Sequence, residues 1–219
     1  MKYRCFNFHS YEIHKMVYDL IKPESSVLDL GCATGYFAKE LHRKKCKVTG
    51  VDIDSKALHE AKKYCDKVIL GNLDLPNNKL IPKQKYDYIL MLDIIEHLQH
   101  FNDLLVILRT RLNQNGKIII STPNIAHLSI RLKLLLGNFN YTEYGILDNT
   151  HVHFFTLKSL TDILLRDKYK IESIKASADF GQLPHVGRLL KHIPKEIQWH
   201  ITKIIPTLLG VQWLAIATL

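Results

Sequence analysis

The chain has 219 residues, of which 47% are hydrophobic, and its formal net charge at pH 7 is +9. This length supports one sizeable core, and the absence of a signal peptide or a span-length apolar run predicts a cytoplasmic single domain, residues 1–219. The excess lysines are scattered along amphipathic segments, which favours a solvated surface over a nucleic-acid site. No Cys-x-x-Cys pair occurs, so reduced, buried thiols are expected at Cys5, Cys32, Cys46 and Cys65 rather than disulfides or a zinc site.

Strands and helices alternate over the first two thirds of the chain. A helix is predicted over residues 10–21, because apolar residues recur there at helical spacing and Pro23 follows. Further strands are expected at 27–30, 48–51, 67–70, 86–93 and 117–121, and helices at 36–44, 55–64 and 101–112. This β-α-β-α-β order is typical of a parallel sheet with right-handed crossovers.

The pattern is less regular after residue 121. Residues 122–155 contain apolar and aromatic side chains that would form either a substrate lid or helical turns completing the core. A helix follows near 155–165, with Thr156 as its N-cap, and strands are expected at 170–176 and 211–218. Between these strands, residues 179–210 predict a helical insertion whose basic amphipathic 185–205 segment would pack on the sheet, cover the site, dimerise or contact an anionic membrane.

The most informative motif is the apolar strand that ends in a glycine turn. Asp29, Gly31 and Gly35 follow a buried run at 27–30, and such a turn exposes backbone amides at the start of a helix. Asp52 ends the next apolar run, about 20 positions beyond the turn, where an acidic side chain can bind both ribose hydroxyls. Together these residues predict an adenosine-cofactor site.

The glycine spacing distinguishes among nucleotide-binding families. Gly31-Cys-Ala33-Thr-Gly35 matches neither the dinucleotide fingerprint nor a P-loop, which argues against a dehydrogenase. The segment from Asp29 to Gly35 resembles the first motif of class I S-adenosylmethionine-dependent methyltransferases, with Ala33 in place of the middle glycine. The resemblance implies an α/β, Rossmann-like fold: a seven-stranded, mostly parallel sheet with helices on both faces and a helical lid. It also implies S-adenosylmethionine as the cofactor.

The position of further residues assigns them to that cofactor. Asn72 and Leu73 follow the third strand, where related methyltransferases contact the adenine, and Asp93 ends the fourth strand. The predicted cofactor-binding residues are Asp29, Gly31, Ala33, Gly35, Asp52, Ile53, Asn72, Leu73 and Asp93.

Two later segments contain the residues that we expect to contact the methyl acceptor. Asp93-Ile-Ile-Glu96-His97-Leu resembles the Glu-His-Leu signature of the ubiquinone-biosynthesis O-methyltransferase group, and His151-Val-His153-Phe-Phe-Thr resembles a second segment of that group. Histidine titrates near neutrality, so a histidine can take a proton from an acceptor hydroxyl. The candidate catalytic residues are His97, His151 and His153, with Asp93 and Glu96 to orient them; each histidine could instead be a capping or packing residue.

A metal site is an alternative that the sequence does not favour. It would consist of the mixed carboxylate and imidazole set Asp93, Glu96, His97 and His151, whose donor atoms suit magnesium, manganese or zinc. Such a cluster is implied by the resemblance to ubiquinone and small-RNA methyltransferases, in which a longer Glu occupies the position of Asp93.

The sequence therefore predicts an S-adenosylmethionine-dependent methyltransferase that modifies a small or medium-sized acceptor, most readily at oxygen, by in-line displacement. The alternatives are an RNA 2′-O-methyltransferase and a non-catalytic binding protein with a methyltransferase fold. Neither the acceptor nor the oligomeric state can be derived from the residues.

Overall fold

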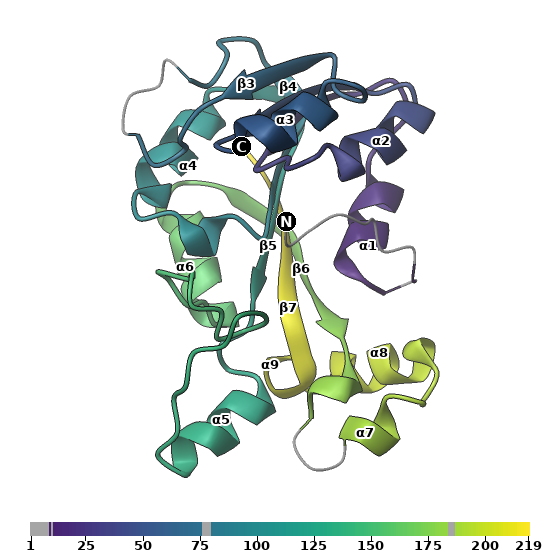
Figure 1. The fold of residues 1–219 in the computed structure, drawn as a ribbon, viewed down its shortest axis with the longest axis vertical. Coiled ribbons are helices and arrows are strands. Elements are labelled where there is room, and N and C mark those ends of the chain that lie inside the picture. The colour runs from purple at the N-terminus through teal and green to yellow at the C-terminus, as the bar shows by residue number, and fades with distance from the viewer. Residues whose placement is uncertain (1–8, 10, 76–79, 184–186) are drawn as a thin grey trace.

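A computed structural model describes residue 9 and residues 11–75, 80–183 and 187–219. Its centre is a seven-stranded sheet with the strand order β3-β2-β1-β4-β5-β7-β6 (Figure 1). The strands are β1 (Ser26–Leu30), β2 (Lys47–Asp52), β3 (Lys67–Leu70), β4 (Tyr86–Leu92), β5 (Leu112–Pro123), β6 (Lys170–Ala178) and β7 (Gly210–Thr218). Strands β1 to β5 are parallel, whereas β7 is antiparallel to both β5 and β6.

Helices cover both faces of the sheet. They are α1 (Ile13–Leu20), α2 (Tyr36–Arg43), α3 (Ser55–Ala61), α4 (Phe101–Arg109), α5 (Leu128–Leu135), α6 (Leu157–Arg166), α7 (Gly187–Leu190), α8 (Lys195–Ile204) and α9 (Pro206–Leu209). Two short 3-10 helices, η1 (Ile95–His97) and η2 (Phe180–Gln182), follow β4 and β6.

The sheet separates two hydrophobic cores because alternate side chains of each strand point to opposite faces. Leu28 and Met91 pack with α4 and α6 on one face, whereas Val27 and Leu90 pack with α1, α2 and α3 on the other. Burial on both faces explains why these strands are almost continuously apolar.

Local signals in the sequence account for several helix starts. Asp54 caps α3 by accepting hydrogen bonds from the backbone N–H groups of Lys56 and Ala57. Thr156 caps α6 in a reciprocal arrangement with Ser159, which confirms the predicted N-cap. Cys32, Cys46 and Cys65 are buried and free, as expected, and Cys5 lies outside the described residues.

The segment between β6 and β7 consists of η2, α7, α8 and α9, at the end of the molecule that also carries α5 (Figure 1). Apolar side chains remain exposed here, including Leu189 and Ile204, each 78% exposed. The predicted membrane contact of the 185–205 segment, of which residues 185 and 186 lie outside the described residues, stays a prediction. Within the part of the chain that the structure describes, no helix has the length and apolar character needed to cross a membrane.

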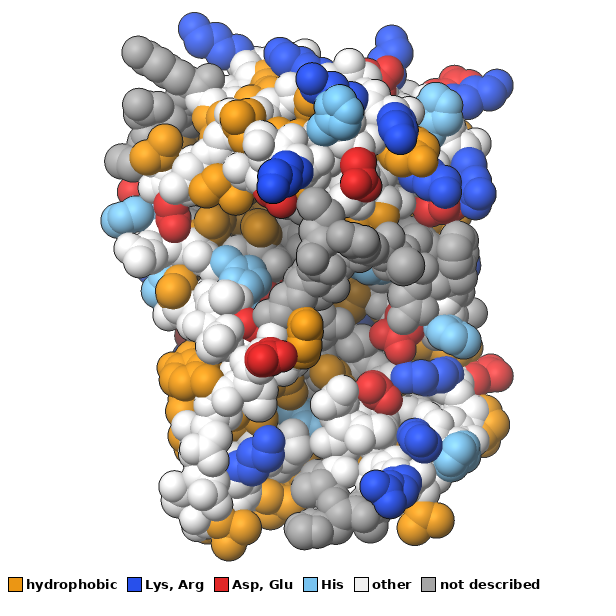
Figure 2. Space-filling view, in the orientation of Figure 1, with side chains coloured by type: hydrophobic (Ala, Val, Ile, Leu, Met, Phe, Trp, Pro, Cys, Tyr) orange, Lys and Arg blue, Asp and Glu red, His pale blue; other side chains and the backbone are white. Residues whose placement is uncertain are grey.

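Positive side chains are spread rather than gathered on the face of the molecule that Figure 2 shows. Figure 2 shows Lys and Arg side chains at both ends of one face of the molecule, with Asp, Glu and His side chains among them. This distribution agrees with the interpretation of the +9 charge as mainly a solvated surface.

Gly35 offers a test of the packing between α3 and the turn that connects β1 to α2. Its φ is +73°, and a Cβ there would lie 2.9 Å from the Cα of Ala61. We expect Gly35→Ala to lower the free energy of unfolding by about 2–4 kcal/mol, because backbone strain and a clash with backbone add together. The measurement is urea unfolding.

Gly137→Ala is the matched control for Gly35→Ala. Gly137 has the same φ of +73°, but a Cβ there would meet no atom within 4 Å among the described residues. Backbone strain alone predicts a loss of about 1 kcal/mol. Equal losses in the two variants would contradict the packing argument.

Candidate functional site

A cavity of about 280 Å³ lies at the carboxyl ends of β1 to β4, and we call it the Asp52 cavity. Ligands of open α/β sheets bind at this edge. The lining residues are Gly31, Asp52, Ile53, Gly71, Asn72, Leu73, Asp74, Ile94, His97 and Leu98. The structure thus brings together five of the predicted cofactor residues, namely Gly31, Asp52, Ile53, Asn72 and Leu73.

The Asp52 carboxylate ties the turn after β1 to the end of β2. One oxygen accepts a hydrogen bond from the backbone N–H of Ala33 at 2.7 Å, and the other accepts one from that of Asp54 at 2.9 Å. Ala33 adopts a left-handed conformation with φ of +46°, so the residue that replaces glycine carries backbone strain. The bond from Ala33 to Asp52 holds the turn in this conformation.

Gly31 is favoured by its left-handed backbone and lies close to the turn that follows β4. Its φ is +76°, and a Cβ there would lie 2.5 Å from Cδ1 of Ile94. The turns after β1 and β4 are therefore in direct contact. Ala33 and Gly35 shape the first turn without lining the Asp52 cavity.

Asp29 lies beneath this turn and is only 4% exposed. Its Oδ2 atom has no hydrogen-bond partner among the described residues. Burial, together with the nearby charge of Asp52, raises the pKa of Asp29 to about 7. Its carboxyl group is therefore held near its point of ionisation at neutral pH.

Asn72 and Ile53 supply different chemistry to the Asp52 cavity. The Asn72 side-chain oxygen accepts a hydrogen bond from the N–H of Asp74 at 2.9 Å, which orients the amide group. Ile53 is 67% exposed and offers apolar surface. An amide and an apolar side chain suit the edge and face of a purine base, and the adenine contact stays a prediction.

A second cavity, of about 210 Å³, lies beside Glu96, and we call it the Glu96 cavity. Its lining residues are Asp93, Glu96, Pro123, Tyr144, Gly145, Ile146, His151, Val211 and Gln212. Residues 144–146 also line an adjoining cavity of about 340 Å³ with Ser129, Lys133 and Gln182. Part of the predicted 122–155 lid therefore borders the Glu96 cavity, whereas its role in binding an acceptor stays a prediction.

Glu96, His97 and His151 form a cluster in which one ligating atom of each lies within 4.8 Å of the others. His97 Nδ1 lies 3.1 Å from the carbonyl oxygen of Thr150, and His151 Nδ1 lies 3.2 Å from that of Ile146. A carbonyl accepts only, so each Nδ1 is assigned the proton and each Nε2 is left as an acceptor.

Burial sets the charge of the cluster. It lowers the pKa of His151, and the neighbouring His97 lowers it further. Burial also raises the pKa of Glu96 well above its usual value, and the charge of Asp93 acts in the same direction. Burial therefore shifts both Glu96 and His151 toward their neutral forms.

The cluster also fits the donor set of a divalent cation in part. Both carboxyl oxygens of Glu96 are buried and lack a hydrogen-bond partner among the described residues, and one ring nitrogen each of His97 and His151 accompanies them. Asp93, the fourth member of the predicted metal set, does not belong to this cluster; its carboxylate is bound by Ser121 and Gln212.

The His153 side chain does not belong to this cluster, although its backbone N–H donates to the carbonyl oxygen of Glu96 at 3.1 Å. Its ring packs edge-on against Phe101, with 5.0 Å between the ring centroids, and it lines neither the Asp52 cavity nor the Glu96 cavity. This packing favours a structural role for His153, and its catalytic role stays a prediction.

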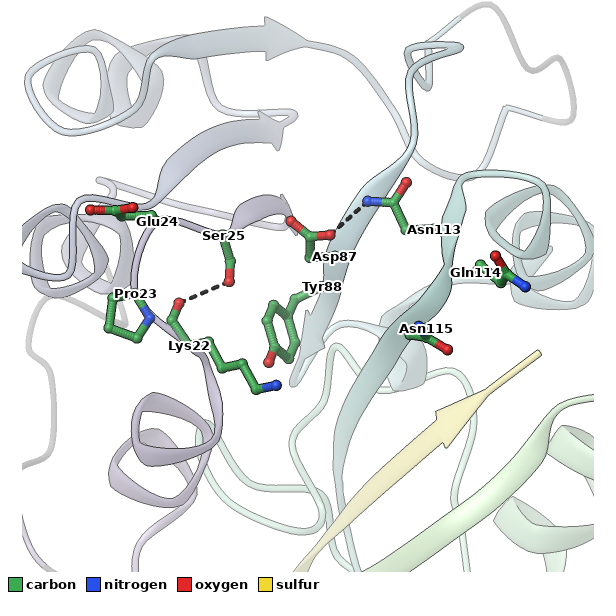
Figure 3. Close-up of a pocket in the computed structure, with 9 residues that line it drawn as sticks. All are labelled: Lys22, Pro23, Glu24, Ser25, Asp87, Tyr88, Asn113, Gln114 and Asn115. Atoms are coloured by element: carbon green, nitrogen blue, oxygen red, sulfur yellow. Dashed lines mark hydrogen bonds between the residues drawn. The ribbon is translucent and has the colours of Figure 1, made fainter.

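The opposite edge of the sheet carries a separate cavity of about 560 Å³ (Figure 3). Lys22 and Ser25 precede β1, whereas Asp87 belongs to β4 and Asn113 to β5. The Asp87 carboxylate accepts hydrogen bonds from Ser26 and from Asn113. The predicted site residues all lie elsewhere, so this cavity is not the candidate site.

Sequence reasoning missed three residues near the two cavities. Gln212 interrupts an otherwise apolar terminal strand and lines the Glu96 cavity, and that interruption was a usable signal. Ser121 precedes the end of β5. His14 on α1 contacts Tyr36 and senses the charge of Asp93, which raises the pKa of His14 while burial lowers it more strongly.

Comparisons with known proteins bear on the family and the fold of the chain. The profile of a family described as "Methyltransferase domain" matches residues 3–174. The chain is 25% identical over 154 residues to the mitochondrial ubiquinone biosynthesis O-methyltransferase of Schizosaccharomyces pombe, covering 68% of this chain and 56% of that protein. It is 28% identical over 168 residues to a Rickettsia conorii protein of the same description, covering 75% and 57%. The chain thus spans little more than half the length of these relatives.

Solved structures extend the comparison to the fold. A SAM-dependent methyltransferase from Archaeoglobus fulgidus superposes with a TM-score of 0.63 at 19% identity, covering 93% of each chain. This likeness and the strand order confirm the predicted seven-stranded, Rossmann-like fold.

Asp52 is the first residue to test at the Asp52 cavity. We expect Asp52→Ala to weaken binding of S-adenosylmethionine by about 2–4 kcal/mol, because the variant loses the ribose acceptor and releases the Ala33 backbone. Titration calorimetry measures the effect. Asp54→Ala is the control, since it removes a nearby carboxylate that caps α3; an unchanged dissociation constant for Asp52→Ala would contradict the assignment.

The raised pKa of Asp29 predicts a specific pH dependence of the free energy of unfolding. Its pKa in the folded chain, about 7, lies above that of an unfolded aspartate, so the folded state holds the proton more tightly. Stability from this group is therefore present at low pH and falls by about 2–3 kcal/mol between pH 5 and pH 7.

The neutral variant Asp29→Asn removes that dependence. Its free energy of unfolding, measured in urea, should rise relative to that of the natural chain as the pH increases from 5 to 7. A difference between the two chains that stays constant over this range would show that Asp29 ionises normally.

Proposed function

We propose that this chain, which belongs to the family of S-adenosylmethionine-dependent class I methyltransferases, transfers the methyl group to an oxygen atom of a small or medium-sized acceptor. S-adenosylmethionine is the methyl donor. The choice of oxygen is supported by the names of the relatives, which are O-methyltransferases. Because the chain spans little more than half of those proteins, the proposal extends to a hydroxyl-bearing small molecule and no further.

The donor is proposed to bind in the Asp52 cavity. Each Asp52 oxygen already accepts one backbone hydrogen bond and retains a lone pair for a ribose hydroxyl. Ile53, Asn72 and Leu73 would contact the adenine, and Gly31 would let the donor approach the backbone closely. The donor would be bound indirectly by three further residues, which shape the turn after β1 without lining the cavity: Asp29, Ala33 and Gly35.

The acceptor is proposed to bind in the Glu96 cavity. The observation that supports this proposal is the cluster of Glu96, His97 and His151, which lies between the two cavities. His97 lines the Asp52 cavity, whereas Glu96 and His151 line the Glu96 cavity. S-adenosylmethionine supplies a methyl group on a positively charged sulfur. An acceptor hydroxyl in the Glu96 cavity would face that methyl group in line, with water largely excluded.

His151 is the proposed general base. Its Nε2 is the acceptor nitrogen, the lowered pKa keeps the ring neutral at pH 7, and the side chain lines the Glu96 cavity. The carbonyl of Ile146 holds the ring in this tautomer. Glu96 in its neutral form could donate a hydrogen bond to the acceptor, and Asp93 lies across the same cavity.

A screen for the acceptor tests the function. The full chain is incubated with S-adenosylmethionine carrying a labelled methyl group and with a panel of phenols, catechols, sugars, amines and RNA, and S-adenosylhomocysteine release is measured. A base-stable labelled ether is the expected product. Labelled amine would contradict O-methylation, labelled RNA would support the alternative RNA enzyme, and failure to bind the donor would favour a non-catalytic protein.

His151→Ala should slow turnover of the acceptor found in that screen about 100-fold, because a positioned base contributes on that scale. The dissociation constant of S-adenosylmethionine should change little. Turnover of the natural chain should persist below pH 6.5 before it falls, since the pKa of His151 is lowered. His153→Phe, which keeps the ring packing on Phe101, should retain turnover; full activity in His151→Ala would remove the base assignment.

The metal alternative predicts a different result in the same assay. Turnover would be lost in a chelator and restored by magnesium, manganese or zinc, and Glu96→Gln would abolish the restoration. In that case Glu96, His97 and His151 would hold the cation, and His151 would not be free to take a proton.

A further inference from the structure

Asp93 is held in an uncommon backbone conformation directly after β4. Its φ is +53°, a left-handed value that is unusual for a residue other than glycine. Its N–H donates to the Ser121 hydroxyl at 3.0 Å, and that hydroxyl donates in turn to Oδ1 of Asp93 at 2.8 Å. Ser121 is fully buried, so this reciprocal pair fixes both the backbone and the side chain of Asp93.

Gln212 completes the clamp from the last strand. Its side-chain amide donates to both carboxylate oxygens of Asp93, at 2.9 and 3.0 Å. Gln212 itself is fixed, because it is paired with Pro123 in the antiparallel ladder of β5 and β7. Both oxygens of Asp93 therefore accept hydrogen bonds from neutral donors. Conformations determined by several contacts in this way concentrate at functional sites.

The clamped carboxylate lies at the junction of the two cavities. Asp93 lines the Glu96 cavity, whereas the next residue, Ile94, lines the Asp52 cavity and packs closely on Gly31. A donor whose nucleoside occupies the Asp52 cavity must bring its sulfur alongside residues 93–97 to deliver a methyl group into the Glu96 cavity.

We propose that Gln212 and Ser121 are positioning residues that direct the Asp93 carboxylate at the positively charged sulfur, so that the site binds S-adenosylmethionine in preference to S-adenosylhomocysteine. This rests on the proposed location of the donor. Transfer breaks the carbon–sulfur bond, leaves its electron pair on a neutral sulfur and forms the carbon–oxygen bond, while the hydroxyl proton leaves to the base. The attraction to Asp93 therefore exists for the donor and is lost for the product.

Neighbouring titratable groups leave this charge uncancelled. Burial favours the neutral forms of Glu96, His14 and His151, three groups on which the charge of Asp93 acts. Because the positive charge on sulfur decreases during transfer, a fixed carboxylate stabilises the bound donor more than the transition state. The clamp consequently serves donor selection and product release rather than the rate of the chemical step.

Binding measurements on the full chain test this without an identified acceptor. Titration calorimetry with S-adenosylmethionine and with S-adenosylhomocysteine is run on the natural chain, Asp93→Asn, Gln212→Leu and Ser121→Ala. We expect the first two variants to lose about tenfold in affinity for the charged donor, the usual scale of one such charge contact, and less than twofold for the neutral product. Ser121→Ala should show the same selective loss to a smaller extent.

Ser177→Ala is the matched control. It removes the hydrogen bond to the backbone of Gln212 and leaves the contact with Asp93 in place. Its ratio of the two affinities should equal that of the natural chain. Asp93→Asn keeps the shape of the side chain. If Gln212→Leu does not fold, the ratio of the two affinities in Asp93→Asn is sufficient to test the inference.

Two results would overturn the inference. Equal losses of affinity for both ligands in Asp93→Asn would show that Asp93 acts only on structure, and unchanged affinity for both ligands would show that its charge does not face the sulfur. If the natural chain binds neither ligand, the donor assignment fails together with this inference, whereas intact binding with an unchanged ratio removes this inference alone.

Discussion

The hydrogen bond from the Ala33 N–H to the Asp52 carboxylate is the contact on which the geometry of the site depends. It joins the turn after β1 to the end of β2, and so fixes a turn that includes a strained non-glycine residue. The same turn packs through Gly31 on the turn after β4, which carries Asp93, Glu96 and His97. A change at Asp52 would therefore reach both cavities, although Asp52 itself lines only one.

The carboxyl groups of Asp93 and Glu96, which follow β4, have different environments and are suited to different roles. Asp93 accepts hydrogen bonds from Gln212 and Ser121 and remains partly exposed. Glu96, three residues later, is 1% exposed and lacks hydrogen-bond partners among the described residues, so its pKa is raised and the neutral acid is favoured. The hydrogen-bonded, partly exposed carboxylate of Asp93 can act as a charge, whereas the buried Glu96 is shifted toward a neutral form that can donate a hydrogen bond.

Local sequence features were sufficient to predict the succession of strands β1 to β5 along the chain, because each apolar run is short and is bounded by turns. They also located Asp52 and Asn72 at one cavity, since carboxyl ends of neighbouring parallel strands meet at one edge. The clamp on Asp93 could not be derived in this way. It depends on the register of β7 against β5, which places Gln212 opposite Pro123, 89 positions away along the chain, and antiparallel register over such separations is not encoded by local patterns.

The histidines illustrate the same limit at the level of single side chains. His97, His151 and His153 are equivalent as residue types, yet backbone carbonyls orient the first two toward Glu96 while Phe101 packs against the third. Spacing alone cannot separate them, because 151 and 153 follow no regular strand or helix whose faces would be known in advance. What distinguishes His151 from His153 is its contact with Ile146, five residues earlier in the same 122–155 segment. The local conformation of residues 146–151 therefore controls whether the proposed base presents Nε2 to the Glu96 cavity. A rearrangement of these residues that breaks the contact would free the ring to change tautomer, and acceptor binding and base activation would then be linked through one carbonyl group.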